Sequence, residues 1–474
     1  MSDVQNKRVI IVGGGLAGMA CAAALETLRP QGLNVSLLEA RHALGGRASS
    51  FEDQETPGEQ LDNCQHVLLG CCTNLINLYQ RLGTYDRITF YPDVHFLDDT
   101  GKRHDLSAIA GLPAPLHLGP AMLLFSLLTI GERRAVVRAM RAMLRLGHAG
   151  REKLENVSFG EWLDRYAQPP ELITKFYDAV LVGALNEQTR AASAKYAIQV
   201  FQDAMLAHSH GYVIGLPNCP LGELYAKGPC ADLRLNTRVD SMRFAEASSP
   251  TRIQSVTLRG GEELPADAVV LATNHHAVQR WVPAELQARD DRFPGLKQLE
   301  SVPILGVHLW FDRPVLRLPF AALTKGPLQW LFRKDADGRI LHGVISAARD
   351  WVNIPNEQAI RQFEEQIRSL LPAARDAKLL RHVIVIEKRA TFTPKPGADA
   401  FRPTQAPPPP PTGGIENLFL AGDYTKTDWP ATMEGATRAG YLAAEAVAQS
   451  FGITAKFLVP DLPIEWPARW MGLR

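Results

Sequence analysis

The first forty residues alternate between apolar runs and a glycine-rich turn. Residues 7–12 form a β-branched apolar run, which predicts a parallel strand buried on both faces. The run 13–18 (Gly-Gly-Gly-Leu-Ala-Gly) follows at once, 16–28 is rich in Ala and Leu and predicts a helix, and 34–38 predicts a second strand ending at Glu39. Strand, glycine turn, helix and strand in this order predict an α/β domain of the Rossmann type.

Each part of this motif suits a dinucleotide. Gly13 permits the tight turn, Gly15 lets the backbone approach a pyrophosphate, and Gly18 lets the helix pack closely on the strand. The helix N-terminus attracts phosphate, and Glu39 would accept hydrogen bonds from a ribose diol. A plain glycine turn is the alternative, but the flanking strand and helix favour the dinucleotide. The candidate cofactor contacts of this region are Gly13, Gly15, Leu16, Ala17, Gly18, Glu39, Ala40 and Arg41.

A second glycine pair, Gly45-Gly46, precedes Arg47 shortly after the ribose-binding position. Two glycines allow the chain to cross close to a cofactor, and an arginine there could neutralise a pyrophosphate. A nicotinamide-dependent dehydrogenase has no need of this segment, so it favours FAD over NAD. A solvated turn is the alternative.

Near the other end of the chain, the apolar run 418–421 predicts a short strand that ends in Gly422-Asp423. Residues 432–447 carry small side chains at helical spacing, which predicts a helix packed closely against a ligand or a sheet. Its N-terminus would present free amide groups to an electron-rich edge. The segment therefore predicts a second cofactor contact.

Glu39 with Gly45-Gly46-Arg47, and the segment 417–441, resemble the paired flavin motifs of the superfamily of FAD-dependent amine oxidases and phytoene desaturases. The similarity runs from about residue 7 to residue 449. It implies FAD as the cofactor and a Rossmann-like FAD-binding domain of the amine-oxidase type with an inserted α+β substrate domain. It also implies that Asp423 binds the ribityl chain, that Met433 lies by the flavin pyrimidine, and that Val239 meets the adenine through its backbone. The remaining contacts that it implies are Gly46, Arg47, Cys64, Gln65 and Gly422.

Within that superfamily, residues 61–75 and 427–430 most resemble the hydroxysqualene dehydroxylase branch. This resemblance implies an oxidoreductase of squalene and hopanoid biosynthesis that transfers a hydride from reduced FAD to hydroxysqualene, with loss of water. An oxidative isoprenoid desaturase of the phytoene type is the alternative with the opposite electron flow. A non-catalytic isoprenoid-binding escort protein is the alternative of another class. An amine oxidase is disfavoured because no aromatic pair is placed to form a flavin-facing cage.

Loss of a hydroxyl group requires an acid that protonates the departing oxygen. The candidates are Cys64 and His66, with Asp428 as the next choice. Each has a structural alternative, because a lone cysteine is usually a small buried hydrophobe and a histidine at a strand end usually serves the fold.

The FAD-binding domain is expected to be discontinuous. Its predicted segments are 1–80, 211–280 and 415–450, the substrate domain takes 91–202 and 281–400, and 451–474 is a C-terminal tail. Residues 231–239 and 252–258 alternate between apolar and polar positions and predict antiparallel sheet, whereas 268–273 predicts another buried strand.

Residues 112–153 are the candidate membrane-facing helical element. The apolar run 121–130 leads into a helix that contains seven basic and two acidic residues between Glu132 and Lys153. The basic residues that share one face are Arg134, Arg138, Arg141 and Arg145, and an apolar side is formed by Val136, Val137, Met140 and Leu144. This pattern is typical of a helix in a membrane interface, and a core-packed helix with a solvated arginine face is the alternative. In the tail, Trp466 and Trp470 could be interfacial anchors or could dock on the protein itself.

Composition limits the partners. The chain has 474 residues and a net charge of +1, which gives no overall attraction to nucleic acid. The six cysteines lack metal-binding or disulfide-framework spacing, and no metal motif occurs. We expect a cytoplasmic protein without a signal peptide or membrane span, held peripherally at the inner face of the membrane, with a long-chain isoprenoid substrate. The sequence does not predict the oligomeric state.

Overall fold

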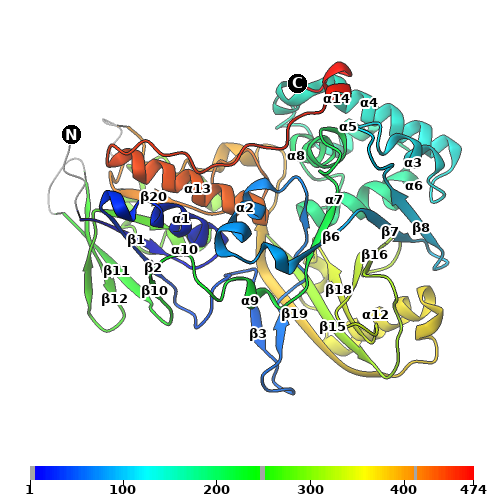
Figure 1. The fold of residues 1–474 in the computed structure, drawn as a ribbon, viewed down its shortest axis with the longest axis horizontal. Coiled ribbons are helices and arrows are strands. Elements are labelled where there is room, and N and C mark those ends of the chain that lie inside the picture. The colour runs from blue at the N-terminus through cyan, green and yellow to red at the C-terminus, as the bar shows by residue number, and fades with distance from the viewer. Residues whose placement is uncertain (1–5, 246–250, 410–413) are drawn as a thin grey trace.

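The computed structural model describes residues 6–245, 251–409 and 414–474. A five-stranded parallel sheet organises one end of the molecule, at the left of Figure 1. In spatial order its strands are β10 (Asp232–Arg234), β2 (Leu33–Leu38), β1 (Lys7–Val12), β14 (Ala268–Leu271) and β20 (Leu418–Leu420). The central strand β1 is buried from Val9 to Val12, so the predicted two-sided burial is confirmed.

Two helices from opposite ends of the sequence lie side by side over this sheet: α1 (Leu16–Glu26) and α13 (Met433–Ser450). Small side chains permit the close approach, because a Cβ on Gly440 of α13 would lie 2.2 Å from the carbonyl oxygen of Ala17 in α1. This contact brings the N-terminal and C-terminal motifs to one region of the fold.

The prediction of antiparallel sheet for 231–239 is wrong in part. The segment divides into β10, which pairs in parallel with β2, and the start of β11 (Val239–Phe244), which pairs antiparallel with β12 (Ile253–Leu258). The division occurs at Asn236, which has a φ of +52° and turns the chain from one sheet to the other. A short strand, β13 (Glu263–Pro265), completes the antiparallel sheet.

A seven-stranded sheet forms the lower right of the molecule (Figure 1). In spatial order its strands are β19 (Leu379–Phe392), β15 (Ser301–Phe311), β18 (Ile340–Ile345), β17 (Trp330–Arg333), β16 (Phe320–Leu323), β7 (Asp93–Leu97) and β8 (Arg103–Ser107). Strand β7 pairs in parallel with β16, so two segments far apart in the sequence share one sheet. The predicted domain boundaries remain predictions.

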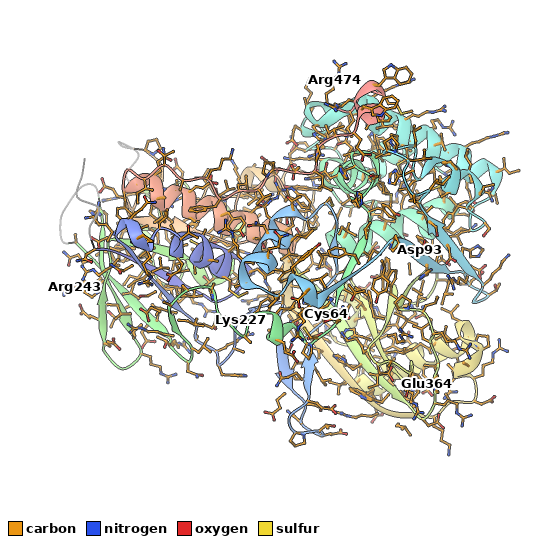
Figure 2. The ribbon with its side chains drawn as sticks, viewed as in Figure 1. Cys64, Asp93, Lys227, Arg243, Glu364 and Arg474 are labelled. Atoms are coloured by element: carbon orange, nitrogen blue, oxygen red, sulfur yellow. The ribbon has the colours of Figure 1, made fainter. Side chains whose placement is uncertain are left out.

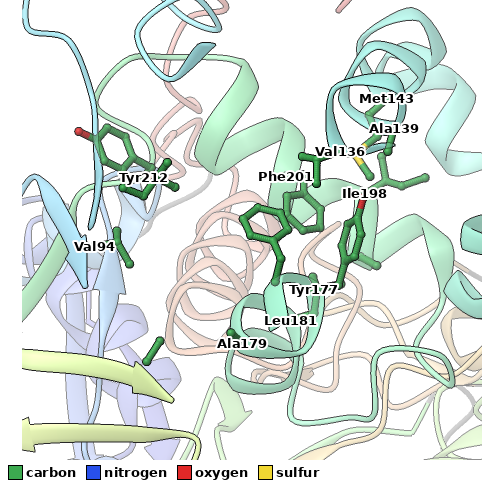
Figure 3. Close-up of a cluster of buried hydrophobic side chains, with 14 of the residues drawn as sticks. Val94, Val136, Ala139, Met143, Tyr177, Ala179, Leu181, Ile198, Phe201 and Tyr212 are labelled. Atoms are coloured by element: carbon green, nitrogen blue, oxygen red, sulfur yellow. The ribbon is translucent and has the colours of Figure 1, made fainter. Parts of the chain in front are cut away.

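Helices form the upper right of the molecule (Figure 1). They are α3 (Gly119–Leu124), α4 (Ile130–Glu152), α5 (Phe159–Arg165), α6 (Pro170–Leu172), α7 (Asp178–Leu185) and α8 (Ala194–Phe201). Figure 3 shows Val136, Ala139 and Met143 of α4 beside Ile198 and Phe201 of α8 in the core.

The apolar side of α4 packs partly into the protein core. Val136 and Leu144 are buried in the protein core, whereas Val137 and Met140 are only partly buried. The arginine face is the one that remains open to solvent. A core-facing helix and a membrane-facing helix have the same 3.6-residue period, so the sequence could not distinguish them.

The C-terminal tail docks on this helical layer through α14 (Trp466–Trp470) and the residues after it. Ala468 and Leu473 are buried, and the N–H of His148 donates to the carbonyl oxygen of Arg474 at 2.9 Å. Trp466 and Trp470 stay exposed at 65% and 82%. Across the described ranges, none of the helices is both long and apolar enough to cross a bilayer.

Short elements complete the fold. The strands are β3 (Ser50–Glu52), β4 (Gln60–Asp62), β5 (Leu68–Leu69), β6 (Ile88–Tyr91) and β9 (Ile214–Pro217). The helices are α2 (Thr73–Leu82), α9 (Leu221–Leu224), α10 (His275–Val278), α11 (Ala284–Gln287) and α12 (Asn356–Leu370).

Candidate functional site

In the glycine turn between β1 and α1, packing requires glycine at two positions, whereas a third position has room for a ligand beside its backbone. A Cβ on Gly18 would lie 1.9 Å from the carbonyl oxygen of Gly13, and Gly13 has a φ of +111°. A Cβ on Gly15 would meet only the Cα of Gly46 within 4 Å, at 3.9 Å. No side chain caps the N-terminus of α1 among the described contacts, so the amides of Leu16 and Ala17 begin a helix whose end suits an anion.

Glu39 lies at the carboxyl end of β2, beside this turn. Its carboxylate accepts hydrogen bonds from the N–H groups of Gly14 at 2.7 Å and Arg41 at 2.8 Å. The side chain is 8% exposed, whereas Ala40 and Arg41 are exposed. The two backbone donors fix the carboxylate at the sheet edge where a Rossmann domain binds ribose.

The second glycine pair lies against the first turn. The N–H of Gly45 donates to the carbonyl oxygen of Gly14 at 2.9 Å. Gly46 has a φ of +61°, and a Cβ there would lie 3.1 Å from the Cα of Gly15. The two glycine segments thus form one backbone surface, in which Gly46 is crowded against Gly15 and has a backbone conformation that favours glycine, whereas a Cβ on Gly15 would lie at an ordinary contact distance.

Arg47 joins the N-terminal and C-terminal motifs. Its guanidinium donates to the carboxylate of Asp423 at 2.6 Å and to the carbonyl oxygen of Ala390 at 2.5 Å. Asp423 is 4% exposed and follows Gly422 directly after β20. A cation and a carboxylate that are 376 positions apart therefore meet beside the glycine surface.

Three side chains from outside the loop 422–428 bind its backbone. They are Arg402, Gln405 and Gln199, all buried. Arg402 donates to the carbonyl oxygens of Asp423 at 3.2 Å and Thr425 at 2.5 Å, Gln405 donates to Lys426 at 2.7 Å, and Gln199 donates to Asp428 at 3.0 Å. The loop that presents Asp423 is thus held by α8 of the helical layer and by the strap 402–405. The sequence motifs gave no signal for these residues.

Cys64, Gln65 and His66 follow β4, and Figure 2 shows Cys64 near the centre of the molecule. Lys334 Nζ donates to the Asp62 carboxylate at 3.2 Å and to Gln65 Oε1 at 3.0 Å. His66 Nε2 lies 3.3 Å from Asn63 Oδ1. The segment is therefore fixed to the seven-stranded sheet by a lysine that follows β17.

Burial shifts the pKa values of both candidate acids away from those of the free side chains. Burial raises the pKa of the Cys64 thiol to about 12, so the thiol is protonated at neutral pH. Burial lowers the pKa of His66 to about 4, so its imidazole is neutral. Both groups can donate a hydrogen bond, but neither is a charged acid.

Two buried histidines lie behind this segment and were not predicted. His308 and His342 are opposite each other on β15 and β18, with their Nδ1 atoms 3.3 Å apart. His308 Nε2 lies 2.9 Å from the carbonyl oxygen of Asp62. Burial, reinforced by His308 and Lys334, lowers the pKa of His342 well below its ordinary value. A polar residue inside two apolar strands is the only signal that the sequence offered for this pair.

Thr273 and His275 follow β14 at the same sheet edge as the glycine turn, and neither was predicted as a site residue from the sequence. The Thr273 hydroxyl is buried without a hydrogen-bond partner among the described residues, and its methyl group lies 3.1 Å from a Cβ built on Gly13. His275 Nε2 donates to the carbonyl oxygen of Leu299 at 2.9 Å, and burial lowers the pKa of His275 to about 4. A signal was available, because ligands bind at the carboxyl ends of parallel strands.

Val239, Met433 and Asp428 are the remaining site residues that were predicted from the sequence. Val239 begins β11 and accepts a hydrogen bond from the indole of Trp281 at 3.3 Å. Met433 is the first residue of α13, after the N-cap Thr432. Asp428 is exposed with a φ of +58°, and no described contact joins its carboxylate to Cys64 or His66.

These residues fit a dinucleotide. The open backbone at Gly15, the uncapped start of α1, the Glu39 carboxylate, the unpartnered Thr273 hydroxyl and the Arg47–Asp423 pair offer donors and acceptors for phosphate and ribose groups. Among the described residues no cluster of His, Cys, Asp or Glu is arranged to hold a metal ion.

Comparison with known proteins agrees with this arrangement. Residues 16–448 match the model of the family of flavin-containing amine oxidoreductases. The 15-cis-phytoene desaturase of Synechococcus elongatus is 28% identical over 93% of this chain and 95% of its own length. The zeta-carotene desaturase of a Synechocystis strain is 27% identical over 93% of this chain and 97% of its own length.

Solved structures share the fold. A putative protoporphyrinogen oxidase from Exiguobacterium superposes with a TM-score of 0.65 at 18% identity, covering 94% of this chain and 99% of its own. The cyclohexylamine oxidase from Brevibacterium oxydans superposes with a TM-score of 0.64 at 19% identity, covering 94% of this chain and 100% of its own.

Proposed function

This chain belongs to the family of flavin-containing amine oxidoreductases and uses FAD, and from that premise we propose that it reduces hydroxysqualene to squalene. In this reaction the carbon–oxygen bond of the alcohol breaks, the carbon receives a hydride, and the oxygen leaves as water after taking up a proton. Bound FAD, once reduced by an external donor, supplies the hydride. The protein must bind the isoprenoid, hold the cofactor and deliver the proton.

The observation that carries this proposal is the pair of proton donors on the segment 61–66. An allylic alcohol loses water only when its oxygen is protonated or strongly hydrogen-bonded, whereas a hydrocarbon substrate has no oxygen to protonate. The buried Cys64 thiol is protonated at neutral pH and can donate a hydrogen bond to the departing oxygen, and Lys334 holds Gln65 next to it. We assign the Cys64 thiol as the candidate acid and the neutral His66 imidazole as its alternative. Asp428 is the weakest of the three because it is exposed.

Apolar side chains that pack on the same core cluster as Cys64 suit a long isoprenoid. They come from several elements that pack on one core and remain partly exposed. The set comprises Val67, Leu69, Tyr91, Val180, Val200, Met205, Val213, Ile304 and Trp330. We propose that the substrate contacts these side chains, which would exclude water from the reacting carbon.

Oxidative desaturation of an isoprenoid is the second candidate. The specific observation in its favour is that the relatives reported above are named phytoene and zeta-carotene desaturases and span over nine-tenths of this chain. This activity uses the same fold with electrons flowing from substrate to FAD. The escort hypothesis predicts that the purified protein carries no flavin, and the flavin content of the purified protein tests it.

Peripheral contact with the inner face of the cytoplasmic membrane is also part of the proposal. Exposed apolar side chains gather on the segments 109–130 and α14: Ile109, Leu112, Leu116, Leu123, Leu124, Ile130, Trp466 and Trp470. Glu465 accepts a hydrogen bond from the N–H of Ala114, which brings the tail next to the loop that carries Leu112 and Leu116. A surface of this kind would let an insoluble isoprenoid enter from the bilayer.

The test is a single anaerobic turnover. The purified protein is photoreduced, mixed with hydroxysqualene, and monitored for squalene and for reoxidation of the flavin. We expect equal amounts of both, and no squalene with free reduced FAD. Oxidation of phytoene by the oxidised protein, without squalene formation in the first reaction, would favour the desaturase. A colourless protein that cannot be reconstituted with FAD would favour the escort.

A further inference from the structure

Four arginines on the outer face of α4 have no acidic partner in the described part of the chain: Arg134, Arg138, Arg141 and Arg145. They are exposed and follow one another at spacings of four, three and four residues. Like charges at these spacings destabilise a helix. None of the acidic residues in the ranges 6–245, 251–409 and 414–474 forms an ion pair with this row. The guanidinium groups of the row are therefore free to bind an anion from outside the chain.

A groove runs along this row. Its volume is about 550 Å³, and it is lined by the four arginines together with Leu123, Val137, Ala142 and Tyr166. The guanidinium of Arg133 donates to the carbonyl oxygens of Leu128 at 2.8 Å and Leu123 at 2.7 Å, so it fixes α3 against the start of α4. The groove thus has an apolar side, which Arg133 holds in place, next to its row of arginines.

We propose that this groove binds the headgroup of an anionic phospholipid, with the phosphate among Arg138, Arg141 and Arg145 and the first part of an acyl chain against Leu123 and Val137. Guanidinium groups bind phosphate oxygens in bidentate geometry. Leu124 and Ile130, next to the groove, are 78% and 66% exposed, which continues the apolar surface toward a bilayer. The inference rests on the membrane contact proposed above and gives it a chemical partner.

The test compares two triple variants in vesicle co-sedimentation with the FAD-loaded protein and without substrate. One variant is Arg138→Gln/Arg141→Gln/Arg145→Gln. The control, Arg243→Gln/Arg259→Gln/Arg289→Gln, removes the same charge from exposed positions outside the helical layer. Figure 2 labels Arg243. Vesicles contain phosphatidylcholine alone or with a third of phosphatidylglycerol.

We expect wild type and control to bind the anionic vesicles alike, and the groove variant to bind at least about tenfold more weakly, since each basic residue near the surface contributes on the order of 1 kcal/mol. Native mass spectrometry should show one phosphatidylglycerol retained by wild type and lost in the groove variant and in Leu123→Ser, but kept in Leu124→Ser.

Equal binding by the groove variant and wild type would overturn the inference, and so would an equal loss in the control variant, which would indicate a diffuse field. Displacement of vesicles by millimolar inorganic phosphate would indicate a free-phosphate site instead. Co-purification of nucleic acid that is lost only in the groove variant would assign the groove to a different partner. Because no substrate is present, failure of hydroxysqualene turnover leaves this result unaffected.

Discussion

The two ends of the cofactor region are built in different ways. At the nucleotide end, backbone groups of two glycine segments and the start of α1 make the surface, and side chains contribute little besides Glu39. At the end near Cys64, side chains from β4, β15, β18 and the residue after β17 make the surroundings. A binding surface made of backbone is disrupted when a substitution adds a side chain. A site made of side chains loses its contacts one at a time, as each side chain is removed.

The strongest test of this difference adds one methyl group at the nucleotide end. Gly18→Ala places a Cβ 1.9 Å from the carbonyl oxygen of Gly13, and neither backbone can move without disturbing the turn. We expect a loss of at least about 3 kcal/mol in stability and of nearly all bound FAD. The flavin-to-protein absorbance ratio and thermal unfolding measure both effects.

The matched control for that variant is Gly131→Ala in the first turn of α4, where a Cβ meets nothing within 4 Å. Alanine there should keep full FAD content and change stability by no more than about 1 kcal/mol, in the stabilising direction. A Gly18→Ala protein with normal flavin content would show that the turn is less constrained than its geometry requires.

The next largest effect is expected at Arg402, which binds the loop of Asp423 from outside either motif. Its side chain is 1% exposed and also pairs with Asp399 at 3.1 Å. Removing one partner of a buried charge pair costs about 3–5 kcal/mol. Arg402→Gln should therefore be destabilised and release FAD on dialysis, whereas Arg402→Lys should keep part of both properties.

Arg190→Gln is the control for Arg402, because its ion pair with Asp164 is exposed at 54% and 60%. Exposed pairs contribute about 0–1 kcal/mol, so this variant should retain its flavin and its melting temperature. Equal FAD affinity in Arg402→Gln and wild type would limit Arg402 to a role in the fold.

The same contrast explains what the sequence could predict. The glycine turn, Glu39 and the Gly422–Asp423 segment are short and contiguous, so local pattern was sufficient to place them. His308, His342, Lys334 and Arg402 become neighbours of the site only through sheet pairing and packing between distant segments. Likewise, the alternation in 231–239 suited either of two sheets, and only the turn at Asn236 decided between them.

At the Cys64 end we expect a smaller and more selective effect. If the thiol protonates the leaving oxygen, Cys64→Ala should lower kcat about 100-fold with FAD content unchanged, and Cys64→Ser should retain part of the rate because its hydroxyl can donate. His66→Ala distinguishes the alternative acid. The control is Cys21→Ala, a fully buried thiol of α1. Full turnover in both Cys64→Ala and His66→Ala would remove both residues as the acid.

The smallest expected effect is a pH dependence carried by Glu155, which lies behind the strap of Arg402. Its carboxyl group accepts a hydrogen bond from the N–H of Asp399 at 3.0 Å. Burial, together with the charge of Asp399, raises the pKa of Glu155 to about 7, despite the nearby Lys195 and Arg402. The folded protein therefore binds a proton at pH values where the unfolded chain has lost it.

For a raised carboxyl pKa, the stabilising contribution is complete below the ordinary pKa of glutamate and is lost as the pH rises to about 7. Wild type should lose on the order of 1 kcal/mol of stability between pH 5 and pH 8, because the side chain is partly exposed and solvent screens the full shift. Glu155→Gln, which resembles the protonated form, should lose less over this range, as denaturant titrations at both pH values would show. If both proteins lose the same amount of stability between pH 5 and pH 8, Glu155 titrates normally. The strap 402–405 then contributes no pH dependence to the loop 422–428.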